Sequence, residues 1–262
     1  MIKAKKSLGQ NFLIDKNVIN KITNIVNIES KSILEIGPGT GNLTRSLIKK
    51  KPKKFYVIEK DKRLILQLKK EFQNQIILIN DDILNIDENL LSEDKLVVFG
   101  NLPYNISTEI LCKWILNLND QKFWFKNLIL MFQKEVADRI LSEYNSSKYG
   151  RLSILANWKL DIKKIIDIKP NCFSPKPKID SSLLYFSPKD NFFKLKNSHS
   201  LEKVTRIFFN QRRKMIKKPF SQLFSGNENI STKLNIDLNL RPQNLNFDTY
   251  YKLALEYEKL GS

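Results

Sequence analysis

Histidine and cysteine are scarce in this chain of 262 residues, which has one histidine and two cysteines. Cys112 and Cys172 lie far apart in the sequence and form no CxxC motif, so we expect reduced thiols and no disulfide. These few side chains do not supply the ligands of a typical zinc site, and we expect no bound metal. His199 lies in a polar stretch where we expect a solvated helix start, which makes a Ser-His-Asp mechanism improbable.

Long apolar runs are missing as well. No stretch approaches the roughly 20 apolar residues that are needed to cross a bilayer, and the basic N-terminus continues into polar residues rather than into the apolar region of a signal peptide. Hydrophobic residues make up 42% of the chain and charged residues 27%, which is typical of a globular protein with a buried core. We therefore expect a cytoplasmic protein with no membrane anchor, and a monomer.

Acidic residues are outnumbered by basic ones, 27 to 45, and the resulting net charge of +18 indicates a polyanionic partner. Part of this excess reflects a general abundance of lysine, which supplies 37 of the basic residues. Arginine is the better indicator because the chain has only eight. Three of them fall within residues 206–213, and residues 203–218 contain seven positive charges and no negative one.

Strand-like and helix-like patterns alternate through the first two-thirds of the chain. Nearly unbroken apolar strands that alternate with helices predict a parallel sheet covered on both faces. The expected strands are residues 33–36, 55–58, 76–79, 96–99, 128–132 and 183–186. The clearest expected helices are residues 63–72, 107–118 and 135–144.

The pattern changes after Pro188, where an irregular polar stretch leads into helices without strands. Val204, Ile207, Phe208 and Met215 are spaced to share one helical face, and residues 250–260 form a last amphipathic stretch. We place a domain boundary there. Residues 1–188 then form one domain with a basic N-terminal arm, and residues 189–262 form a second, helical domain.

Three of the eight glycines, Gly37, Gly39 and Gly41, fall within five residues between an apolar run and a helical pattern. Glycines at a strand–turn–helix junction let the backbone bend sharply and approach a ligand. The dinucleotide fingerprint is G-x-G-x-x-G, whereas the spacing here is E-x-G-x-G-x-G, beginning at Glu35. This variant suits S-adenosylmethionine, against whose amino-acid portion Gly37 and Gly39 can lie while the Glu35 carboxylate offers negative charge to its cationic end.

Two more carboxylates follow expected strands. Glu59 comes after the second strand and can accept hydrogen bonds from both ribose hydroxyls, as the acidic residue of dinucleotide sites does. Asp82 comes after the third strand and can accept a hydrogen bond from the adenine amino group of the cofactor. Either residue taken alone can equally be an ordinary loop carboxylate, so the glycine turn remains the stronger indication.

The string Asn101-Leu102-Pro103-Tyr104 follows the fourth expected strand, at the sheet edge where open α/β sheets bind ligands. Its chemistry suits methylation of an exocyclic amine such as adenine N6, whose lone pair is delocalised into the ring. The Asn101 side-chain oxygen and the Leu102 carbonyl can accept both N–H groups and favour a pyramidal nitrogen. Pro103 fixes the turn, and Tyr104 offers a face for stacking a flipped base.

With these motifs the chain resembles the small-subunit ribosomal RNA adenine dimethyltransferases, which methylate N6 of two adjacent adenosines near the 3′ end of 16S ribosomal RNA. The resemblance extends over nearly the whole length. Its motifs are residues 8–13 (LGQNFL), 35–44, 101–108 (NLPYNIST), 133–136, 149–153, 173–181 (FSPKPKIDS) and 210–214 (NQRRK).

The resemblance implies a Rossmann-like class I methyltransferase sheet of seven strands, one of them antiparallel, followed by a small all-helical C-terminal domain. It implies that Phe173 packs on the target base opposite Tyr104. By residue pattern alone Phe173 is an ordinary core phenylalanine. The resemblance also implies that S-adenosylmethionine contacts Asn11, Leu13, Gly37, Glu59, Asp82 and Asn101.

The clustered basic residues are then expected to hold RNA phosphates and to offset the free energy needed to extrude the target base. Arg212 and Arg213 are the first candidates because a guanidinium grips phosphate with two hydrogen bonds. The alternative is that these two arginines lie on a solvated helix face and bind no RNA. The full set of expected RNA contacts is Lys5, Lys6, Arg206, Arg212, Arg213, Lys214 and Lys217.

Four other functions remain to be weighed. A 23S ribosomal RNA adenine methyltransferase of the resistance type shares the glycine and phenylalanine motifs, although the motif at residues 8–13 favours the small-subunit group. An adenine-N6 DNA methyltransferase would need a target-recognition domain that we do not find in the sequence. A non-catalytic ribosome assembly factor would not need Asn101 and Tyr104, and the glycine spacing disfavours a dehydrogenase.

Overall fold

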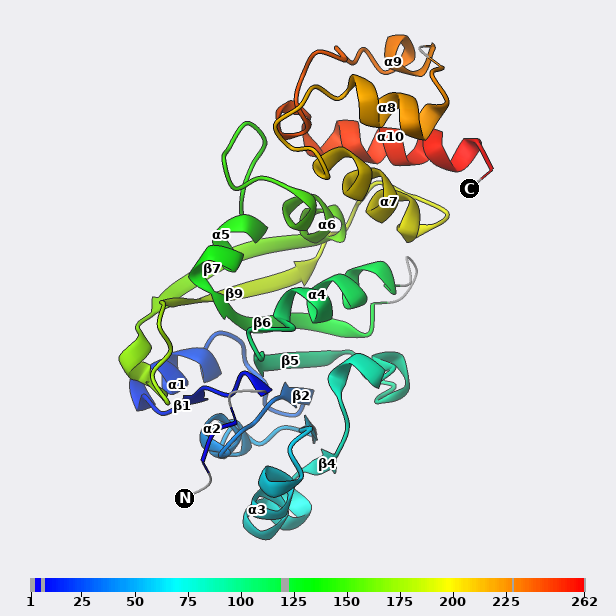
Figure 1. Cartoon of the computed structure of the whole chain (residues 1–262). Helices are drawn as coiled ribbons and strands as arrows, with labels where there is room; N and C mark the ends of the chain where they lie inside the picture. Colours follow the sequence, from blue (N-terminus) through cyan, green and yellow to red (C-terminus); the bar gives the residue numbers. More distant parts are fainter. Residues whose placement is uncertain (1–2, 6–7, 119–122, 228, 262) are drawn as a thin grey trace. The chain divides into compact units, whose positions relative to one another are not determined.

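The computed structural model describes residues 3–5, 8–118, 123–227 and 229–261. Figure 1 shows the ribbon with its elements labelled. The chain divides into two compact units. Unit 1 consists of Met1–Leu111, Gln121–Ala137 and Ile162–Pro188, and unit 2 of Cys112–Asp120, Asp138–Asp161 and Lys189–Ser262.

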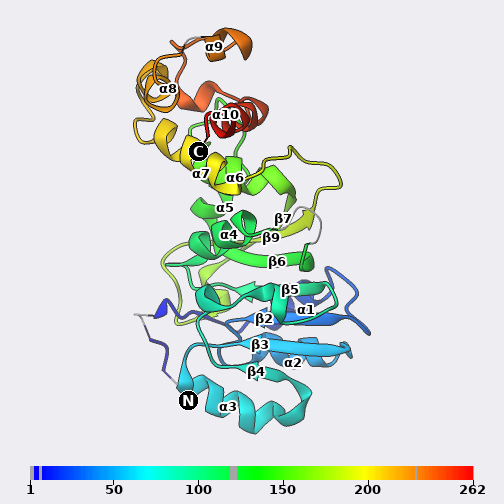
Figure 2. The ribbon, with the colours of Figure 1, turned by 90° about the vertical axis from the view of Figure 1, so that its right-hand side faces the viewer.

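Unit 1 is built on a sheet that has seven strands within the described residues, and Figure 2 shows these strands in succession. Strands β4, β3, β2, β5 and β6 are mutually parallel, and β9 runs antiparallel to β6. The seven-stranded mixed sheet with its antiparallel pair therefore confirms the expected fold class. In spatial order the strands are β4 (Ile77–Ile79), β3 (Lys54–Ile58), β2 (Ser32–Ile36), β5 (Leu96–Asn101), β6 (Phe125–Gln133), β9 (Ser181–Pro188) and β7 (Leu160–Ile168).

The central strands β2, β3, β5 and β6 read as nearly continuous apolar runs because both of their faces are buried. Ile33 of β2, Val57 of β3 and Phe99 of β5 belong to one core cluster with Leu47 of α2 and Leu68 of α3. All five side chains are completely buried. Alternate residues such as Leu34 and Val98 point to the opposite face, where they are completely buried as well. The packing of α1, α2 and α3 on one face keeps the strand ends in register beside the loops that follow them.

Polar side chains cap the N-termini of α1 and α3. Asp15 and Asp61 each accept a hydrogen bond from a main-chain N–H of the first turn of their helix, whereas α2 begins directly after the left-handed Gly41. The helices up to β7 are α1 (Lys16–Thr23), α2 (Asn42–Ile48), α3 (Lys62–Phe72), α4 (Ser107–Leu116), α5 (Lys134–Ile140) and α6 (Arg151–Lys159). Short 3-10 turns lie at Gln73–Gln75, Ile83–Asn85, Glu88–Leu90, Pro170–Cys172 and Pro242–Asn244.

Unit 2 is helical apart from the first residues of β7. Helix α7 packs on α6, α8 and α10, and the ring centroids of Phe208 and Tyr250 lie 5.7 Å apart in an edge-to-face contact between α7 and α10. The helices after residue 188 confirm the expected change from alternating to all-helical structure. They are α7 (Ser198–Phe209), α8 (Lys217–Phe224), α9 (Asn229–Lys233) and α10 (Phe247–Lys259).

Three expectations about local structure were wrong or incomplete. Helix α7 ends at Phe209, so Met215 does not share its face and is 57% exposed. Helix α5 ends at Ile140, earlier than expected. Strand β7 and helix α6 were not predicted. The charged residues of β7 obscure its alternation, and α6 is buried over most of its surface, so neither shows a clear apolar face.

A two-stranded ribbon lies outside the main sheet. Strand β1 (Phe12–Leu13) pairs antiparallel with β8 (Phe173–Ser174), so that Leu13 lies opposite Phe173. This ribbon attaches the N-terminal segment to unit 1. No helix among the described residues is long and apolar enough to span a membrane.

Candidate active site

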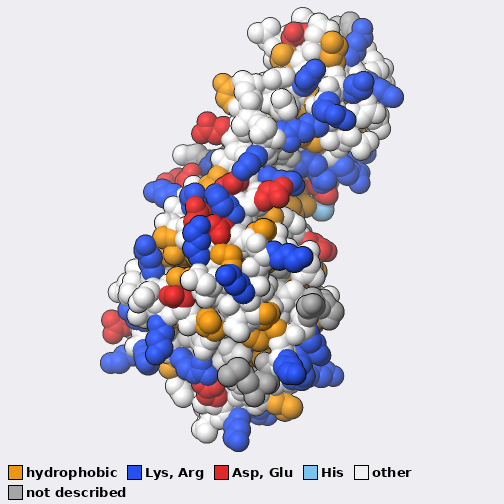
Figure 3. Space-filling model, turned by 60° about the vertical axis from the view of Figure 1, so that its left-hand side comes forward, with side chains coloured by type: hydrophobic (Ala, Val, Ile, Leu, Met, Phe, Trp, Pro, Cys, Tyr) orange, Lys and Arg blue, Asp and Glu red, His pale blue; other side chains and the backbone are white. Residues whose placement is uncertain are grey.

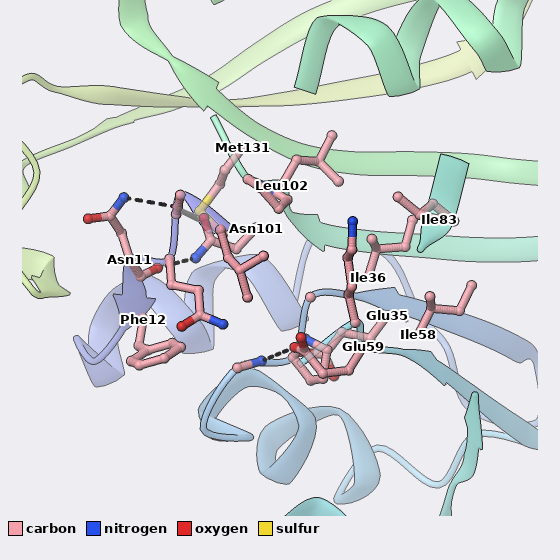
Figure 4. A pocket seen from close by; sticks show the side chains of 18 of the residues that line it. Asn11, Phe12, Glu35, Ile36, Ile58, Glu59, Ile83, Asn101, Leu102 and Met131 are labelled. Carbon is pink, nitrogen blue, oxygen red and sulfur yellow. Dashed lines mark hydrogen bonds between the residues drawn. The ribbon is translucent and has the colours of Figure 1, made fainter. Parts of the chain in front are cut away.

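A pocket lies at the carboxyl ends of β2, β3 and β5, within unit 1 (Figure 4). The strands are parallel, so the loops that follow them meet at one edge of the sheet, where ligands of open α/β sheets bind. All eight residues expected to bind the cofactor line this pocket, although they come from five separate parts of the chain. They are Asn11, Leu13, Glu35, Gly37, Gly39, Glu59, Asp82 and Asn101.

The glycine turn forms one wall. Gly37, Gly39 and Gly41 all have left-handed backbone angles, with φ of 65°, 57° and 79°, which side chains with a Cβ rarely adopt. A Cβ on Gly37 would have only the Asn101 carbonyl oxygen within 4 Å, at 3.5 Å, so this position opens into the pocket. A Cβ on Gly39 would lie 2.6 Å from the Phe12 ring. The turn is thus both a cradle for a ligand and a close contact with the N-terminal segment.

Glu35 is a deeply buried residue of the pocket lining. Its side chain is 1% exposed and accepts a 2.7 Å hydrogen bond from Thr44 Oγ1. Burial raises the pKa of Glu35 to about 8, against the lowering effect of the Thr44 hydroxyl. The group is therefore mostly protonated at neutral pH in the free protein. In the free protein its hydrogen bond with Thr44 holds the side chain beside the turn, and its expected role toward the cationic end of the cofactor stays a prediction.

Glu59 and Asp82 are carboxylates held in place by hydrogen bonds. Glu59 accepts hydrogen bonds from the main-chain N–H groups of Asp61, at 2.9 Å, and Gly39, at 3.4 Å. A carboxylate has about four lone-pair positions, so capacity for two ribose hydroxyls remains. Burial raises the pKa of Glu59. Asp82 forms a 2.6 Å ion pair with Lys60 and accepts from Leu84 N–H, which fixes its position at the pocket edge.

The charge of the lining discriminates between cofactors. Its charged side chains are Glu35, Glu59, Asp81 and Asp82 with a single lysine, Lys60. Even with Glu35 neutral, acidic groups are in excess. A pyrophosphate would be repelled here, whereas a sulfonium and an ammonium would be attracted. The residues present therefore fit S-adenosylmethionine better than a dinucleotide. Among the described residues no cluster of histidine, cysteine and carboxylate side chains has the arrangement of a metal site.

The second motif faces this cradle. Asn101 is the last residue of β5, and Asn101, Leu102, Pro103 and Tyr104 all line the pocket. A Cβ on the preceding Gly100 would lie 2.9 Å from the end of the Leu102 side chain, which would have to shift to admit it. Figure 4 shows Asn101, Leu102 and Met131 at one end of the pocket and Glu35 and Glu59 at the other. The structure thus brings the proposed substrate acceptors and the glycine turn together.

Phe173 is not brought to the pocket. It is 3% exposed and belongs to the core cluster of unit 1, and it does not line the pocket. This placement is the ordinary core position that its pattern alone suggested. The contact with a target base that the resemblance implies therefore requires this ring to turn out of the core, and it stays a prediction.

Several pocket residues were not singled out from the sequence. Gln10, Phe12 and Asn42 line the pocket and lie in motifs that carry the family resemblance, and Met131 comes from β6. Asn42 donates a 2.8 Å hydrogen bond from Nδ2 to the Leu13 carbonyl. Nothing in the local pattern of these residues indicates a shared site, because they meet only when the sheet has formed.

Some of the basic residues expected to bind RNA have partners within the protein, and the others are exposed. Arg212 is partly engaged within unit 2, since its guanidinium donates to the Ser146 carbonyl and to the Gln243 side chain, each at 3.2 Å. In unit 1, Lys5 lies 3.9 Å from Asp61, and Lys6 is outside the described residues. Figure 3 shows lysine and arginine side chains spread widely over the face drawn. The exposed remainder are Arg206, Arg213, Lys214 and Lys217.

The fold and the pocket together define a class I S-adenosylmethionine-dependent methyltransferase. Comparison with known proteins gives the family. The family model described as ribosomal RNA adenine dimethylase matches residues 1–259, and this chain belongs to that family. Its members act on adenines of ribosomal RNA, which agrees with the expectation drawn from the sequence.

Curated relatives cover almost the whole chain. The ribosomal RNA small subunit methyltransferase A of Pelagibacter ubique (strain HTCC1062) is 65% identical over 259 residues, which is 99% of this chain and 98% of the relative. The protein of the same name from Ehrlichia ruminantium (strain Gardel) is 43% identical over 260 residues, 97% of each chain.

Solved structures agree with the fold. A dimethyladenosine transferase from Plasmodium falciparum has a TM-score of 0.77 at 28% identity and covers 95% of this chain and 98% of its own. The 23S rRNA methyltransferase ErmE has a TM-score of 0.67 at 20% identity, covering 96% of this chain and 100% of its own. At that identity the likeness to ErmE shows the fold alone.

Proposed function

We propose that this protein transfers methyl groups from S-adenosylmethionine to N6 of two adjacent adenosines near the 3′ end of 16S ribosomal RNA. The product is N6,N6-dimethyladenosine, formed during assembly of the small ribosomal subunit in the cytoplasm. Family membership supports adenine dimethylation, and the 65% identity to a small subunit methyltransferase supports the choice of RNA. We also propose that it acts as a monomer.

The single observation that supports the reaction is the position of Asn101. It ends strand β5 inside the pocket that the glycine turn bounds, and its side chain is partly exposed there. When bound, S-adenosylmethionine supplies a methyl group activated by a sulfonium. Asn101 Oδ1 and the Leu102 carbonyl accept the two N–H groups of the substrate amine, which reduces conjugation of its lone pair with the ring. Catalysis then depends on positioning and on oriented dipoles.

The remaining site residues bind and orient the cofactor and the substrate base. Glu59 accepts from ribose hydroxyls and Asp82 from the adenine amino group of the cofactor, while Gly37 and Gly39 admit its amino-acid portion. Tyr104 stacks on the flipped substrate base, a contact worth about 1–3 kcal/mol. Phe173 completes the stack from the other side after leaving the core. Asn11 and Leu13 contribute contacts from the N-terminal segment.

The RNA is held by exposed basic residues. Arg206, Arg213, Lys214 and Lys217 have exposed side chains that can neutralise phosphates. Arg212 still has N–H groups available beyond the two that it uses within unit 2. Lys5 and Lys6 of the N-terminal arm add further positive charge. These contacts supply affinity, and the pocket supplies selection for adenine.

The test is methyl transfer from labelled cofactor to small subunits that lack the modification. Wild type should incorporate label, and primer extension should stop at two adjacent adenosines near the 3′ end of 16S RNA. Asn101→Ala should lower kcat by about 10²- to 10³-fold, as expected for loss of one oriented polar group. Asn74→Ala, an exposed amide of the same unit, is the control. Full activity of Asn101→Ala, or a stop on 23S RNA instead, would refute the proposal.

A further inference from the structure

The N-terminal strap, defined here as residues 8–13, is a part of the pocket whose role the proposed function leaves open. All six of its residues line the pocket, yet it is not part of the seven-stranded sheet. Only its last two residues pair with another strand, through β1 and β8. The position of residues 8–11 therefore depends on contacts made by the loops that the strap crosses.

Both motifs that supply the expected site residues contact the strap. Asn42, directly after the glycine turn, donates to the Leu13 carbonyl at 2.8 Å, and the Phe12 ring packs against Gly39. In the second motif, Asn101 Nδ2 donates to the Asn11 carbonyl at 2.7 Å, as the dashed line in Figure 4 marks. The strap thus connects the cofactor side of the pocket with the substrate side.

The contact with Asn11 decides which way the Asn101 amide points. The two ends of an asparagine side chain have nearly the same shape and are distinguished by their hydrogen-bond partners. A main-chain carbonyl can only accept, so the NH2 group of Asn101 must face Asn11. Oδ1 is then turned away from the strap and left as an acceptor for the substrate amine. With the amide reversed, Asn101 would present a donor to a group that itself donates.

Gln10 attaches the strap immediately before Asn11. Its Nε2 donates to Asp61 Oδ2 at 3.1 Å, and its Oε1 accepts from the Lys5 main-chain N–H at 2.8 Å. Asp61 is a firm anchor because it is 3% exposed, pairs with Arg63 at 2.6 Å and donates its own N–H to Glu59. Hydrogen bonds from Arg63, with a smaller contribution from Gln10, hold the pKa of Asp61 far below its usual range, so the acceptor stays charged.

We propose that Gln10 is a positioning residue for methyl transfer. By holding the strap to Asp61 it keeps the Asn11 carbonyl on the Asn101 amide, so that Oδ1 of Asn101 stays turned toward the substrate amine. This inference rests on the role given to Asn101 under the proposed function. Gln10 then affects the rate of methyl transfer only indirectly, through Asn11 and Asn101.

A positioning role and a simple binding role have different kinetic consequences. The strap also lines the cofactor pocket, so loosening it weakens cofactor binding in either case. If Gln10 only supports cofactor binding, saturating cofactor restores the full rate. If it orients Asn101, kcat remains low at saturation because the amide still samples the reversed orientation. The division of the effect between KM and kcat therefore distinguishes the two roles.

The experiment uses the full chain with Gln10→Glu, which keeps the shape of the side chain, removes the donor and places a second carboxylate beside Asp61. Gln75→Glu makes the same change on an exposed side chain of unit 1. We expect Gln10→Glu to lower kcat at least tenfold at saturating S-adenosylmethionine and saturating small subunits. We also expect faster amide hydrogen exchange over residues 8–13, measured without cofactor. An unchanged kcat would overturn the proposal, as would unchanged exchange in the strap.

A double variant tests whether Gln10 acts through Asn101. In an Asn101→Ala background, Gln10→Glu should cause no further loss of kcat, because the group that it orients is gone. Multiplicative losses would overturn the proposal. If Gln10→Glu is poorly folded by circular dichroism, Gln10→Met removes both hydrogen bonds without adding charge and is expected to give the same kinetic pattern. Should Asn101→Ala itself keep full activity, the proposed function fails. If only Gln10→Glu keeps kcat, this inference alone fails.

Discussion

The hydroxyl groups of Tyr104 and Ser181 lie 2.5 Å apart, so a residue at the start of β9 holds the ring that follows β5. Burial raises the pKa of Tyr104, which keeps its phenol neutral and able to share this hydrogen bond. Ser181 is completely buried, and Tyr104 is half-buried with its ring at the pocket. The ring is therefore fixed at its polar end, which leaves its face available for stacking.

Replacing this ring should separate stacking from hydrogen bonding. Tyr104→Phe keeps the face and should retain methylation within a few-fold of wild type. Tyr104→Ala loses a stacking interaction of about 1–3 kcal/mol, which corresponds to a rise of about 5- to 150-fold in KM for the small subunit. Steady-state kinetics on unmethylated subunits measures both. Equal losses in the two variants would mean that the hydroxyl, and not the ring face, is what the reaction requires.

Gly39→Ala should weaken cofactor binding. The added Cβ would lie 2.6 Å from Phe12, and the backbone has a φ of 57° that alanine adopts only with strain. We expect a cofactor Kd raised at least tenfold, measured by titration calorimetry. Gly226→Ala is the matched control, because Gly226 is also left-handed, with a φ of 76°, but its nearest neighbour would be 3.9 Å away. Both variants share a backbone cost of about 1 kcal/mol, so only Gly39→Ala should affect Kd. A normal Kd for Gly39→Ala would contradict the cradle assigned to this turn.

Glu35 should make stability depend on pH. Its pKa is raised by burial from 4.5 to about 8 in the folded protein. A raised pKa means that the folded state binds the proton more tightly than the unfolded state, so this contribution is complete below pH 4.5 and is lost as the pH rises toward 8. The free energy of unfolding should therefore fall with pH across that window by up to about 1.4 kcal/mol per pH unit from this group.

Glu35→Gln removes that titration while keeping the shape of the side chain. Denaturant unfolding of both proteins at several pH values should show the variant gaining relative stability as the pH rises from about 5 to about 8. Thr44 can still hydrogen-bond to the amide. A stability difference that stays constant across this range would show that Glu35 does not titrate there.

Exposed charge of unit 2 should set the salt dependence of RNA binding. We expect Arg213→Glu with Lys214→Glu to weaken binding to small subunits and to reduce the salt slope by about 0.7–0.9 for each phosphate that is no longer neutralised. The pair Lys69→Glu and Lys70→Glu, exposed on α3, changes the net charge equally and is the control. An unaltered slope for the unit 2 variant would remove these residues from the RNA interface. Arg212 is unsuitable for this test because its reversal would also break hydrogen bonds within unit 2.

Much of unit 1 could be predicted from the sequence because most of its strands are short apolar runs followed by glycine, proline or polar residues. The six expected strands all occur, although β6 and β9 are each four residues longer than expected. Strand β7 was missed since Asp161, Lys163 and Lys164 hide its alternation. Met215 was assigned to a helical face because its spacing fits, but the chain leaves the helix after Phe209. Spacing alone does not show where a helix ends.

The candidate site could be predicted where its residues lie in compact motifs. Gly37, Gly39, Glu59 and Asn101 were expected at one sheet edge, and the parallel strands place them there. The state of Glu35 could not be predicted, because its pKa depends on complete burial. The hydrogen bonds of Arg212 within unit 2 could not be predicted either, since its partners Ser146 and Gln243 are distant in the sequence.

The sequence by itself determined the class of protein, the cofactor turn and the motif that faces the substrate, because each of these is encoded in a few consecutive residues whose backbone preferences act locally. Only the tertiary structure decided that residues 8–13 close over the pocket and that the Asn11 carbonyl orients an amide 90 positions away. Such contacts form between main-chain and side-chain atoms that meet only after the sheet has assembled, and no local preference of Asn11 or Asn101 encodes them.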